Sequence, residues 1–323
     1  MSDDVYFYEA FEEETEALRR HLPDELSAGF TWRTIQESGH DGPLARIIST
    51  RTQSAFPGAW ADRLDAILTR STGYDHVRDY LRRTGRDIAA GYLPLYCSRA
   101  VAEQAMLLWT ALLRKLPRQV DQFPRFERDG LTGRECRGRT LLVVGVGNIG
   151  HEVVRIGRGL EMNVLGVDID PGHADVDYVS IEEGLPAADV IVCAMNLTDE
   201  NAGYFDRRRL GAARPGTIFV NIARGELAPA ADLLELLDSG RLAGVGLDVY
   251  EGENELAVSL RSGVAPADGP AAASLELAAR PNVIATPHNA FNTAEAIERK
   301  ARRSVESIVE FIRTGAFPSP VPL

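Results

Sequence analysis

The chain has 323 residues, 45% hydrophobic and 25% charged, which is typical of a folded globular protein with one large domain or two ordinary ones. Its net charge of -12 argues against nucleic acid or an anionic membrane as a general partner, because both are bound by basic surfaces. Cys97, Cys136 and Cys193 are widely spaced, so neither a disulfide framework nor a metal site is predicted. The acidic N-terminus and the lack of a long apolar run predict a cytoplasmic protein that does not enter a membrane.

The first hundred residues alternate short apolar runs with stretches of helical periodicity. The helix expected first covers 12–22, with Pro23 just beyond it, and a later helix covers 101–116 and is closed by Pro117. Turn residues follow each apolar run, which indicates a small parallel α/β unit. The strands expected in this unit are 5–8, 45–48, 65–68 and 88–91.

A second α/β unit begins near Leu141. Because periodic helices such as 230–237 separate its strands, a doubly wound parallel sheet is predicted, with ligands at the carboxyl ends of the strands. The segment 255–273 is rich in Gly, Pro, Ala and Ser and is predicted to be a long loop, whereas 293–312 is predicted to be a helix. The strands expected here are 141–144, 164–167, 190–194, 217–221, 244–247 and 283–285.

A GxGxxG turn, Gly145 to Gly150, lies between the first of these strands and a helix. The first glycine permits the tight turn, the second lets a pyrophosphate approach the backbone, and the third lets helix and strand pack closely. The next strand ends in Asp168, near the offset at which an acid meets the adenosine ribose. Asp168 and Asp170 have no arginine beside them, and a carboxylate repels a 2′-phosphate, so NAD is favoured over NADP.

Three later strands are each followed by a functional side chain: Arg224, Glu253 and His288. Taken singly, an arginine is usually a surface charge, a glutamate solvated and a histidine structural. Together they supply what reduction of a 2-keto acid needs. A guanidinium can grip a carboxylate, an imidazolium can donate a proton, and a carboxylate can orient the imidazole. Their coincidence downstream of a dinucleotide turn favours an active site.

The strings 69–75, 145–150, 221–227, 246–253 and 286–291 resemble, in order, the motifs of the D-isomer-specific 2-hydroxyacid dehydrogenases. That family includes D-lactate dehydrogenases and vancomycin-resistance-type 2-keto acid reductases. The resemblance implies an α/β chain of two doubly wound parallel-sheet domains. A Rossmann-type NAD domain, 98–289, would be inserted in a smaller flavodoxin-like substrate domain, 1–97 and 290–323. It also implies an NAD-dependent oxidoreductase that interconverts a 2-keto acid and a D-2-hydroxy acid, and a homodimer involving the helix from Val101.

The resemblance also implies a role for individual positions. The catalytic residues would be Arg224, Glu253 and His288, with His288 as the acid-base group. The substrate would be bound by Thr72, Gly73, Tyr74, Tyr96, Arg224, Phe291 and Arg51. The cofactor would be bound by Gly145, Gly147, Asn148, Ile149, Gly150, Asp168, Met195, Asn196, Asn201, Ile222, Ala223, Arg224, Asp248 and His288, and no residue would bind a metal.

Several positions depart from the family pattern. Asn292 stands where D-lactate dehydrogenases tend to carry Tyr, Asn196 replaces a usual Pro, and Ser98-Arg99 replaces Ser-Pro. Arg51, Arg70 and Arg99 are therefore spare cations, and one of them can serve a second anionic group on a dicarboxylate, phosphorylated or phosphonate substrate. A helix-capping or surface role is an equal alternative for each.

Other activities of related proteins can be weighed on single residues. Thr72 argues against phosphite oxidation, because the phosphite enzymes carry Lys there, and Glu253 argues against formate oxidation, where the partner of the histidine is Gln. Reduction of glyoxylate or hydroxypyruvate stays open. The alternative from another class is an NAD(H)-sensing, corepressor-like binding protein without significant turnover.

Overall fold

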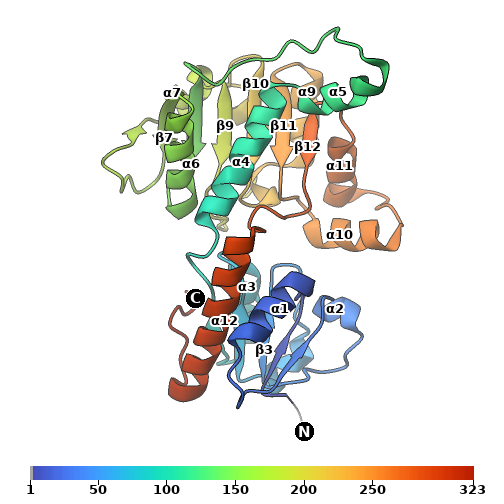
Figure 1. The fold of residues 1–323 in the computed structure, drawn as a ribbon, viewed down its shortest axis with the longest axis vertical. Helices are drawn as coiled ribbons and strands as arrows, with labels where there is room; N and C mark the ends of the chain where they lie inside the picture. The colour runs from blue at the N-terminus through green and yellow to red at the C-terminus, as the bar shows by residue number, and fades with distance from the viewer. Residues whose placement is uncertain (1–2) are drawn as a thin grey trace. The chain divides into compact units, whose positions relative to one another are not determined.

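The computed structural model describes residues 3–323 and divides into two compact units (Figure 1). Unit 1 runs to Cys97 and resumes at Asn292, and unit 2 is Ser98–Phe291. Every pair of neighbouring strands in both sheets is parallel, so the prediction of two parallel α/β sheets is confirmed.

Unit 1 contains a five-stranded sheet in the order β2-β1-β3-β4-β5, which is the flavodoxin-like order. Strands β1, β3 and β4 are buried along their whole length, as expected of parallel strands that are covered on both faces. Helix α12 packs against α1, so helices from the first and last parts of the chain lie side by side in this unit (Figure 1). The strands are β1 (Val5–Phe7), β2 (Ala28–Phe30), β3 (Ile47–Thr50), β4 (Ala66–Thr69) and β5 (Ala89–Gly91). The helices are α1 (Glu12–His21), α2 (Ile35–Ser38), η1 (Gly58–Arg63), α3 (Asp75–Thr84) and α12 (Ala294–Thr314).

Unit 2 contains a seven-stranded sheet in the order β12-β11-β10-β9-β6-β7-β8. The strand order reverses between β6 and β9, and in such sheets ligands bind outside the carboxyl ends of the strands at this switch point. The strands are β6 (Thr140–Val144), β7 (Asn163–Val167), β8 (Asp177–Tyr178), β9 (Val190–Cys193), β10 (Thr217–Asn221), β11 (Leu242–Leu247) and β12 (Val283–Ala285). The helices are α4 (Ser98–Leu113), α5 (Leu116–Gln122), η2 (Phe123–Arg125), α6 (Asn148–Gly159), α7 (Ile181–Ala187), α8 (Arg207–Leu210), η3 (Gly225–Leu227), α9 (Ala230–Asp238), α10 (Glu253–Ser262) and α11 (Gly269–Ala278).

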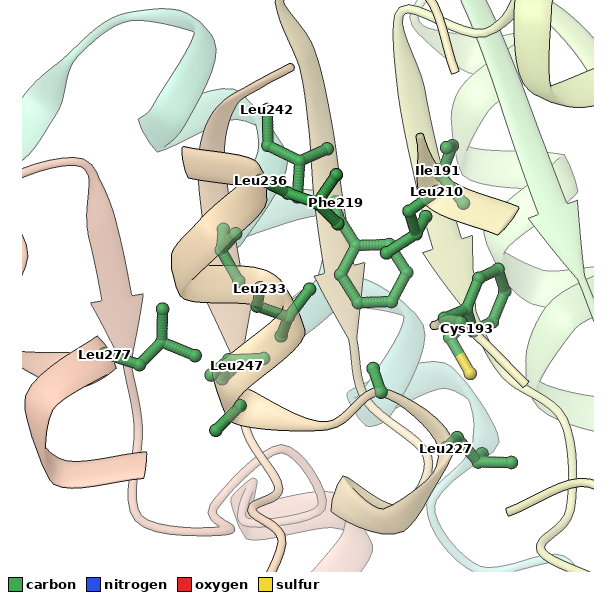
Figure 2. Close-up of a cluster of buried hydrophobic side chains, with 14 of the residues drawn as sticks. Ile191, Cys193, Leu210, Phe219, Leu227, Leu233, Leu236, Leu242, Leu247 and Leu277 are labelled. Atoms are coloured by element: carbon green, nitrogen blue, oxygen red, sulfur yellow. The ribbon is translucent and has the colours of Figure 1, made fainter. Parts of the chain in front are cut away.

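Helices cover both faces of the unit 2 sheet. On one face, α4 and α6 pack against each other, and α4 contacts β10 and β11. On the other face lies a continuous hydrophobic core, in which Leu233 and Leu236 of α9 join Ile191 and Phe219 of the central strands (Figure 2). Leu185 of α7 belongs to the same core. This two-sided burial explains why the strands read as unbroken apolar runs in the sequence.

Two sequence predictions of secondary structure are wrong. Residues 255–273 do not form a loop, because most of them belong to helices α10 and α11. Gly263, with φ 72°, ends α10, and α11 begins at Gly269 with a proline in its first turn. The glycines and proline that suggested a loop are therefore helix boundaries. Likewise Pro117 does not close the helix from Val101: α4 ends at Leu113, and Pro117 lies in the first turn of α5.

Within residues 3–323, no helix is both long and apolar enough to cross a membrane. The three cysteines are free, and burial raises the pKa of the Cys193 thiol in β9 to about 12. Cys193 therefore behaves as a small hydrophobic side chain of the core.

Candidate active site

In the glycine turn after β6, the surroundings of the three glycines differ. Gly145 has φ 89°, and a Cβ there would lie 2.5 Å from the Met195 nitrogen at the end of β9. A Cβ on Gly150 would lie 1.9 Å from the Gly145 carbonyl oxygen. A Cβ on Gly147, in contrast, would meet no atom of residues 3–323 within 4 Å apart from its own chain neighbours. The open side of the turn lies at Gly147, where a pyrophosphate can approach the backbone at the positive end of α6.

Asp168 follows β7 and lies beside this turn. Its Oδ2 accepts a hydrogen bond of 2.6 Å from the Val146 amide, and its Oδ1 accepts one of 3.0 Å from the Asp170 amide. The carboxylate is thus fixed at the edge of the predicted cofactor site, with oxygens that can also accept from a ribose hydroxyl. The arrangement of Gly147 and Asp168 fits NAD.

The other predicted cofactor residues surround the same strand ends. Asn148 and Ile149 form the first turn of α6. In the loop after β9, Asn201 donates to the Asn196 carbonyl at 2.8 Å and accepts from Thr198 N at 2.8 Å, which braces the segment that begins at Met195. Ile222 and Ala223 follow β10, where Ile222 is buried and Ala223 is half-buried.

Arg224 stands on a loop shaped by its neighbours. The side chain of Asn221 donates to the Arg224 carbonyl at 2.8 Å and accepts from the Ala223 amide at 3.0 Å. A Cβ on Gly225 would lie 1.8 Å from the carbonyl carbon of Tyr250, so glycine is required where this loop passes the chain that follows β11. The half-buried Arg224 side chain is therefore held on a narrowly defined backbone.

Glu253 and His288 form a direct pair. The Oε1 atom of Glu253 lies 2.7 Å from Nδ1 of His288, and the side chains are 18% and 19% exposed. Glu253 begins α10, directly after Gly252 at φ 69°, and His288 follows β12 with φ 50°. Because β10, β11 and β12 are neighbours in the sheet, Arg224, Glu253 and His288 all follow the carboxyl ends of adjacent parallel strands. A carboxylate at Nδ1 fixes the ring and makes Nε2 the nitrogen that can exchange a proton with a substrate.

Asp248 has a role in positioning that sequence analysis did not anticipate. Its Oδ1 accepts from Thr286 Oγ1 at 2.5 Å and from the Asn289 amide at 2.8 Å, and its Oδ2 accepts from the Ala290 amide at 2.8 Å. Burial raises the pKa of Asp248, while the neighbouring His288 and these hydrogen bonds oppose that rise. Asp248 thereby holds the loop that carries His288. A contact with the cofactor, predicted from the resemblance, stays a prediction.

The predicted substrate residues Thr72, Gly73, Tyr74, Tyr96 and Arg51 belong to unit 1, and Phe291 is the last residue of unit 2. Thr72 donates to the Leu93 carbonyl at 3.3 Å. The Gly73 carbonyl accepts from Ser71 at 2.7 Å, and the rings of Tyr74 and Tyr92 lie 4.8 Å apart. Tyr96 and Phe291 are buried, and burial raises the pKa of Tyr96 well above its usual value.

The three arginines proposed as spare cations differ in their surroundings. Arg70 is fully buried, and its guanidinium donates to Glu14, Ser49 and the Tyr8 carbonyl. Arg99 is exposed and bonds to Glu103 and Glu152 within unit 2. Neither environment is that of a spare cation. Arg51 is half-buried, with its guanidinium carbon 5.6 Å from the centre of the Phe11 ring.

Sequence analysis did not single out Lys300, which lies beside this group. Its Nζ is 2.9 Å from Glu14 Oε1, 5.3 Å from the centre of the Phe11 ring and 5.9 Å from that of Tyr96. Burial lowers the pKa of Lys300 to about 7, although Glu14 opposes the shift. A charged residue on the buried face of a 21-residue helix was the available signal in the sequence.

Comparison with known proteins identifies the family of the chain. The family described as D-isomer specific 2-hydroxyacid dehydrogenase, NAD binding domain, matches residues 105–290, more than half of the chain. A D-lactate dehydrogenase from Streptococcus agalactiae is 31% identical over 94% of each chain. A D-2-hydroxyacid dehydrogenase (NAD+) from Lacticaseibacillus paracasei is 29% identical over 86% of this chain and 84% of its own.

Among solved structures, D-lactate dehydrogenase from Aquifex aeolicus, complexed with NAD and lactic acid, matches with a TM-score of 0.82 and 28% identity. The match covers 97% of this chain and 98% of that one. The predicted family, its NAD cofactor and its class of enzyme are therefore confirmed. The chain belongs to the D-isomer-specific 2-hydroxyacid dehydrogenase family.

Proposed function

We propose that the protein interconverts a 2-keto acid and the corresponding D-2-hydroxy acid, with Arg224, Glu253 and His288 as its catalytic residues. When bound, NAD supplies or accepts the hydride. The observation that carries the proposal is the 2.7 Å pair between Glu253 and His288, which, like Arg224, follows the carboxyl ends of adjacent strands. A histidine held in this way can donate a proton to the carbonyl oxygen during reduction and remove it during oxidation.

Arg224 has the complementary task of binding the carboxylate and polarising the carbonyl of the substrate. A guanidinium offers paired N–H donors that match the planar carboxylate, and it stays charged at any pH of interest. We propose that unit 1 is the substrate domain and that backbone amides around Thr72, Gly73 and Tyr74 bind the carboxylate as well.

The substrate is proposed to carry a second anionic group, as in a dicarboxylate or a phosphonate. Arg51 and Lys300 both flank the Phe11 ring, at 5.6 and 5.3 Å, and Lys300 also lies over Tyr96. Glu14, which is fully buried, is shared by Arg70 and Lys300. Positive charge therefore exceeds negative charge in this group of Glu14, Arg51, Arg70 and Lys300, which favours an anionic ligand.

The activity is tested by following NADH oxidation with a panel of pyruvate, hydroxypyruvate, oxaloacetate, phenylpyruvate and phosphonopyruvate. We expect turnover with one or more, and the product should be the D-isomer. If NADH binds but no keto acid is reduced, the proposal fails, and the NAD(H)-sensing, corepressor-like alternative is favoured.

The second anionic group is tested with R51Q. We expect kcat/KM for oxaloacetate to fall relative to that for pyruvate by about 10-fold or more, since a charged hydrogen bond contributes roughly 1.5–3 kcal/mol. R99Q is the matched control, because Arg99 is an exposed arginine already engaged by Glu103 and Glu152. Equal losses for the two substrates in R51Q would contradict the assignment.

We also propose that the protein is a homodimer. Leu116, Val120, Phe123 and Phe126, in and just after α5 and η2, are 45%, 66%, 73% and 71% exposed. A run of large apolar side chains in water is unfavourable, and such a patch commonly marks a protein interface. A second copy of the chain is the proposed occupant.

Sedimentation measurements test the dimer. The wild type should have twice the chain mass of 35.3 kDa, and F123D with F126D should shift it toward the monomer. W32S removes another exposed aromatic residue, 62% accessible, from outside this run and should leave the mass unchanged. A dimer that withstands the double substitution would place the interface elsewhere.

A further inference from the structure

Two histidines and an aspartate from separate segments meet at one side of unit 2, away from the acid-base pair. His151 lies in α6, and His173 and Asp175 lie in the loop between β7 and β8. The two imidazole rings stack with centroids 3.9 Å apart and planes 4° from parallel. Nε2 of His151 is 3.1 Å and 3.2 Å from the two carboxylate oxygens of Asp175.

The spacing of His151 and Asp175 is that of two ligands around one metal ion, and His173 lies close by. Zinc binds histidine nitrogen and carboxylate oxygen at about 2.0–2.2 Å, so two tetrahedral ligands of one ion lie roughly 3.3 Å apart. The distance from His151 to Asp175 already has this value, and one ligand atom of each of the three residues lies within 4.8 Å of the other two. Because the two rings are stacked, the His173 ring must turn out of the stack before its nitrogen reaches the same ion.

The surroundings orient the carboxylate and leave the site accessible. Arg158, two turns after His151 on α6, donates from Nη1 to Asp175 Oδ2 at 2.8 Å and from Nη2 to the Asp175 carbonyl, so it fixes the aspartate. Asp175 is exposed and both histidines are half-buried, which lets an ion enter from solvent. Outer groups of this kind commonly tune metal sites.

We propose that His151, His173 and Asp175 bind one divalent transition-metal ion, such as zinc. Two imidazoles and a carboxylate suit zinc, nickel or copper, whereas calcium and magnesium prefer all-oxygen sites. The site is separate from the proposed catalytic pair, because His288 follows β12 and the metal ligands lie next to β8, at opposite edges of the sheet. The bound ion ties α6 to the β7–β8 loop and so stabilises the folded unit.

Calorimetric titration of the full, untagged, EDTA-treated chain with zinc chloride tests the site. We expect one zinc ion per chain, an increase in melting temperature on binding, and affinity at least about tenfold weaker in H151Q and in H173Q. H21Q is the matched control, since His21 also pairs with a carboxylate, Glu298 at 2.7 Å, but forms no metal-ligand group with a second histidine among residues 3–323. Zinc affinity in H21Q should equal that of the wild type.

Circular dichroism and NADH binding check that each variant is folded. If H151Q, in α6, does not fold, H173Q and D175N remain, because both replacements lie in a surface loop. The absorption spectrum of the cobalt-loaded protein provides a second readout, and it should be lost in these loop variants. Absence of zinc binding to the wild type, or zinc binding unchanged in H173Q and D175N, would overturn the proposal.

Discussion

His288 shows how a single residue is prepared for chemistry. It adopts φ 50°, a left-handed conformation that is uncommon for residues other than glycine and in which histidine is enriched among the exceptions. Its amide donates to the Thr286 carbonyl at 2.9 Å, and the flanking amides of Asn289 and Ala290 bind Asp248. The backbone is thus fixed before the ring meets Glu253. Backbone conformations of this kind gather at functional sites.

The acid-base role of His288 predicts a selective kinetic effect. H288Q should lower kcat for keto-acid reduction roughly 10²–10⁴-fold, the range for a positioned proton donor. NADH affinity, measured by fluorescence titration, should change little, because a neutral amide of similar size preserves the loop. A comparable loss of NADH affinity would show that His288 acts through the cofactor site instead.

At the scale of the element, the glycines between β6 and α6 meet two different requirements. Some are needed for the fold of the turn, and one leaves room for a ligand. Gly145 and Gly150 are needed by the protein itself, because a Cβ at either would meet backbone atoms at 2.5 and 1.9 Å. Gly147 has open space instead, so its lack of a side chain serves a ligand.

Alanine at Gly147 and alanine at Gly150 should therefore have different effects on stability and on NADH binding. G147A should keep the stability of the wild type but bind NADH about 10-fold or more weakly, since its methyl group would stand where the pyrophosphate approaches. G150A should lose stability even without cofactor, because the turn and α6 must separate. Urea unfolding and NADH titration of both variants distinguish these effects, and a stable G150A would contradict the geometry.

At the scale of the whole molecule, the chain leaves unit 1 at Cys97 and returns at Asn292, so unit 1 is assembled from both ends of the sequence. Buried charged side chains connect these two parts of unit 1. Glu14 of α1 is bound by Arg70 at 2.8 Å and by Lys300 of α12 at 2.9 Å, and all three side chains are fully buried. Burial alone would raise the pKa of Glu14, but Arg70, Lys300 and Arg51 together outweigh that effect and lower it to about 2.

The buried Lys300 predicts that the stability of the fold rises with pH. Unfolded lysine keeps its proton to about pH 10.4, whereas Lys300 in the fold has a pKa of about 7. Between these values the unfolded state binds more protons, so stability rises with pH. The urea midpoint of the wild type should therefore increase relative to that of K300M from pH 7 to 9.

Arg302 provides the control for that measurement. It lies on the same helix, is half-exposed and pairs with Glu306, and arginine does not titrate in this range. R302M should therefore unfold in parallel with the wild type at every pH. Parallel curves for K300M as well would mean that Lys300 is not held with a lowered pKa.

The sequence by itself determined the two parallel sheets, the NAD cofactor and the family. The periodicity of apolar residues, the residues of the turns and the spacing of motifs are all local properties of the chain. It also predicted that Arg224, Glu253 and His288 lie in the segments after three strands, and these strands are adjacent in the sheet. The prediction of a loop at 255–273 was wrong, because the glycines and the proline there mark the ends of two helices.

Only the tertiary structure decided which side chains meet. His151 and Asp175 are 24 positions apart, and Glu14 and Lys300 belong to opposite ends of the chain, so no local pattern relates them. The fold also shows that Arg70 and Arg99 are not spare cations, because each pairs with a carboxylate of the protein. Burial and pairing depend on distances in space, and these are set by how the helices pack on the sheets rather than by spacing along the chain.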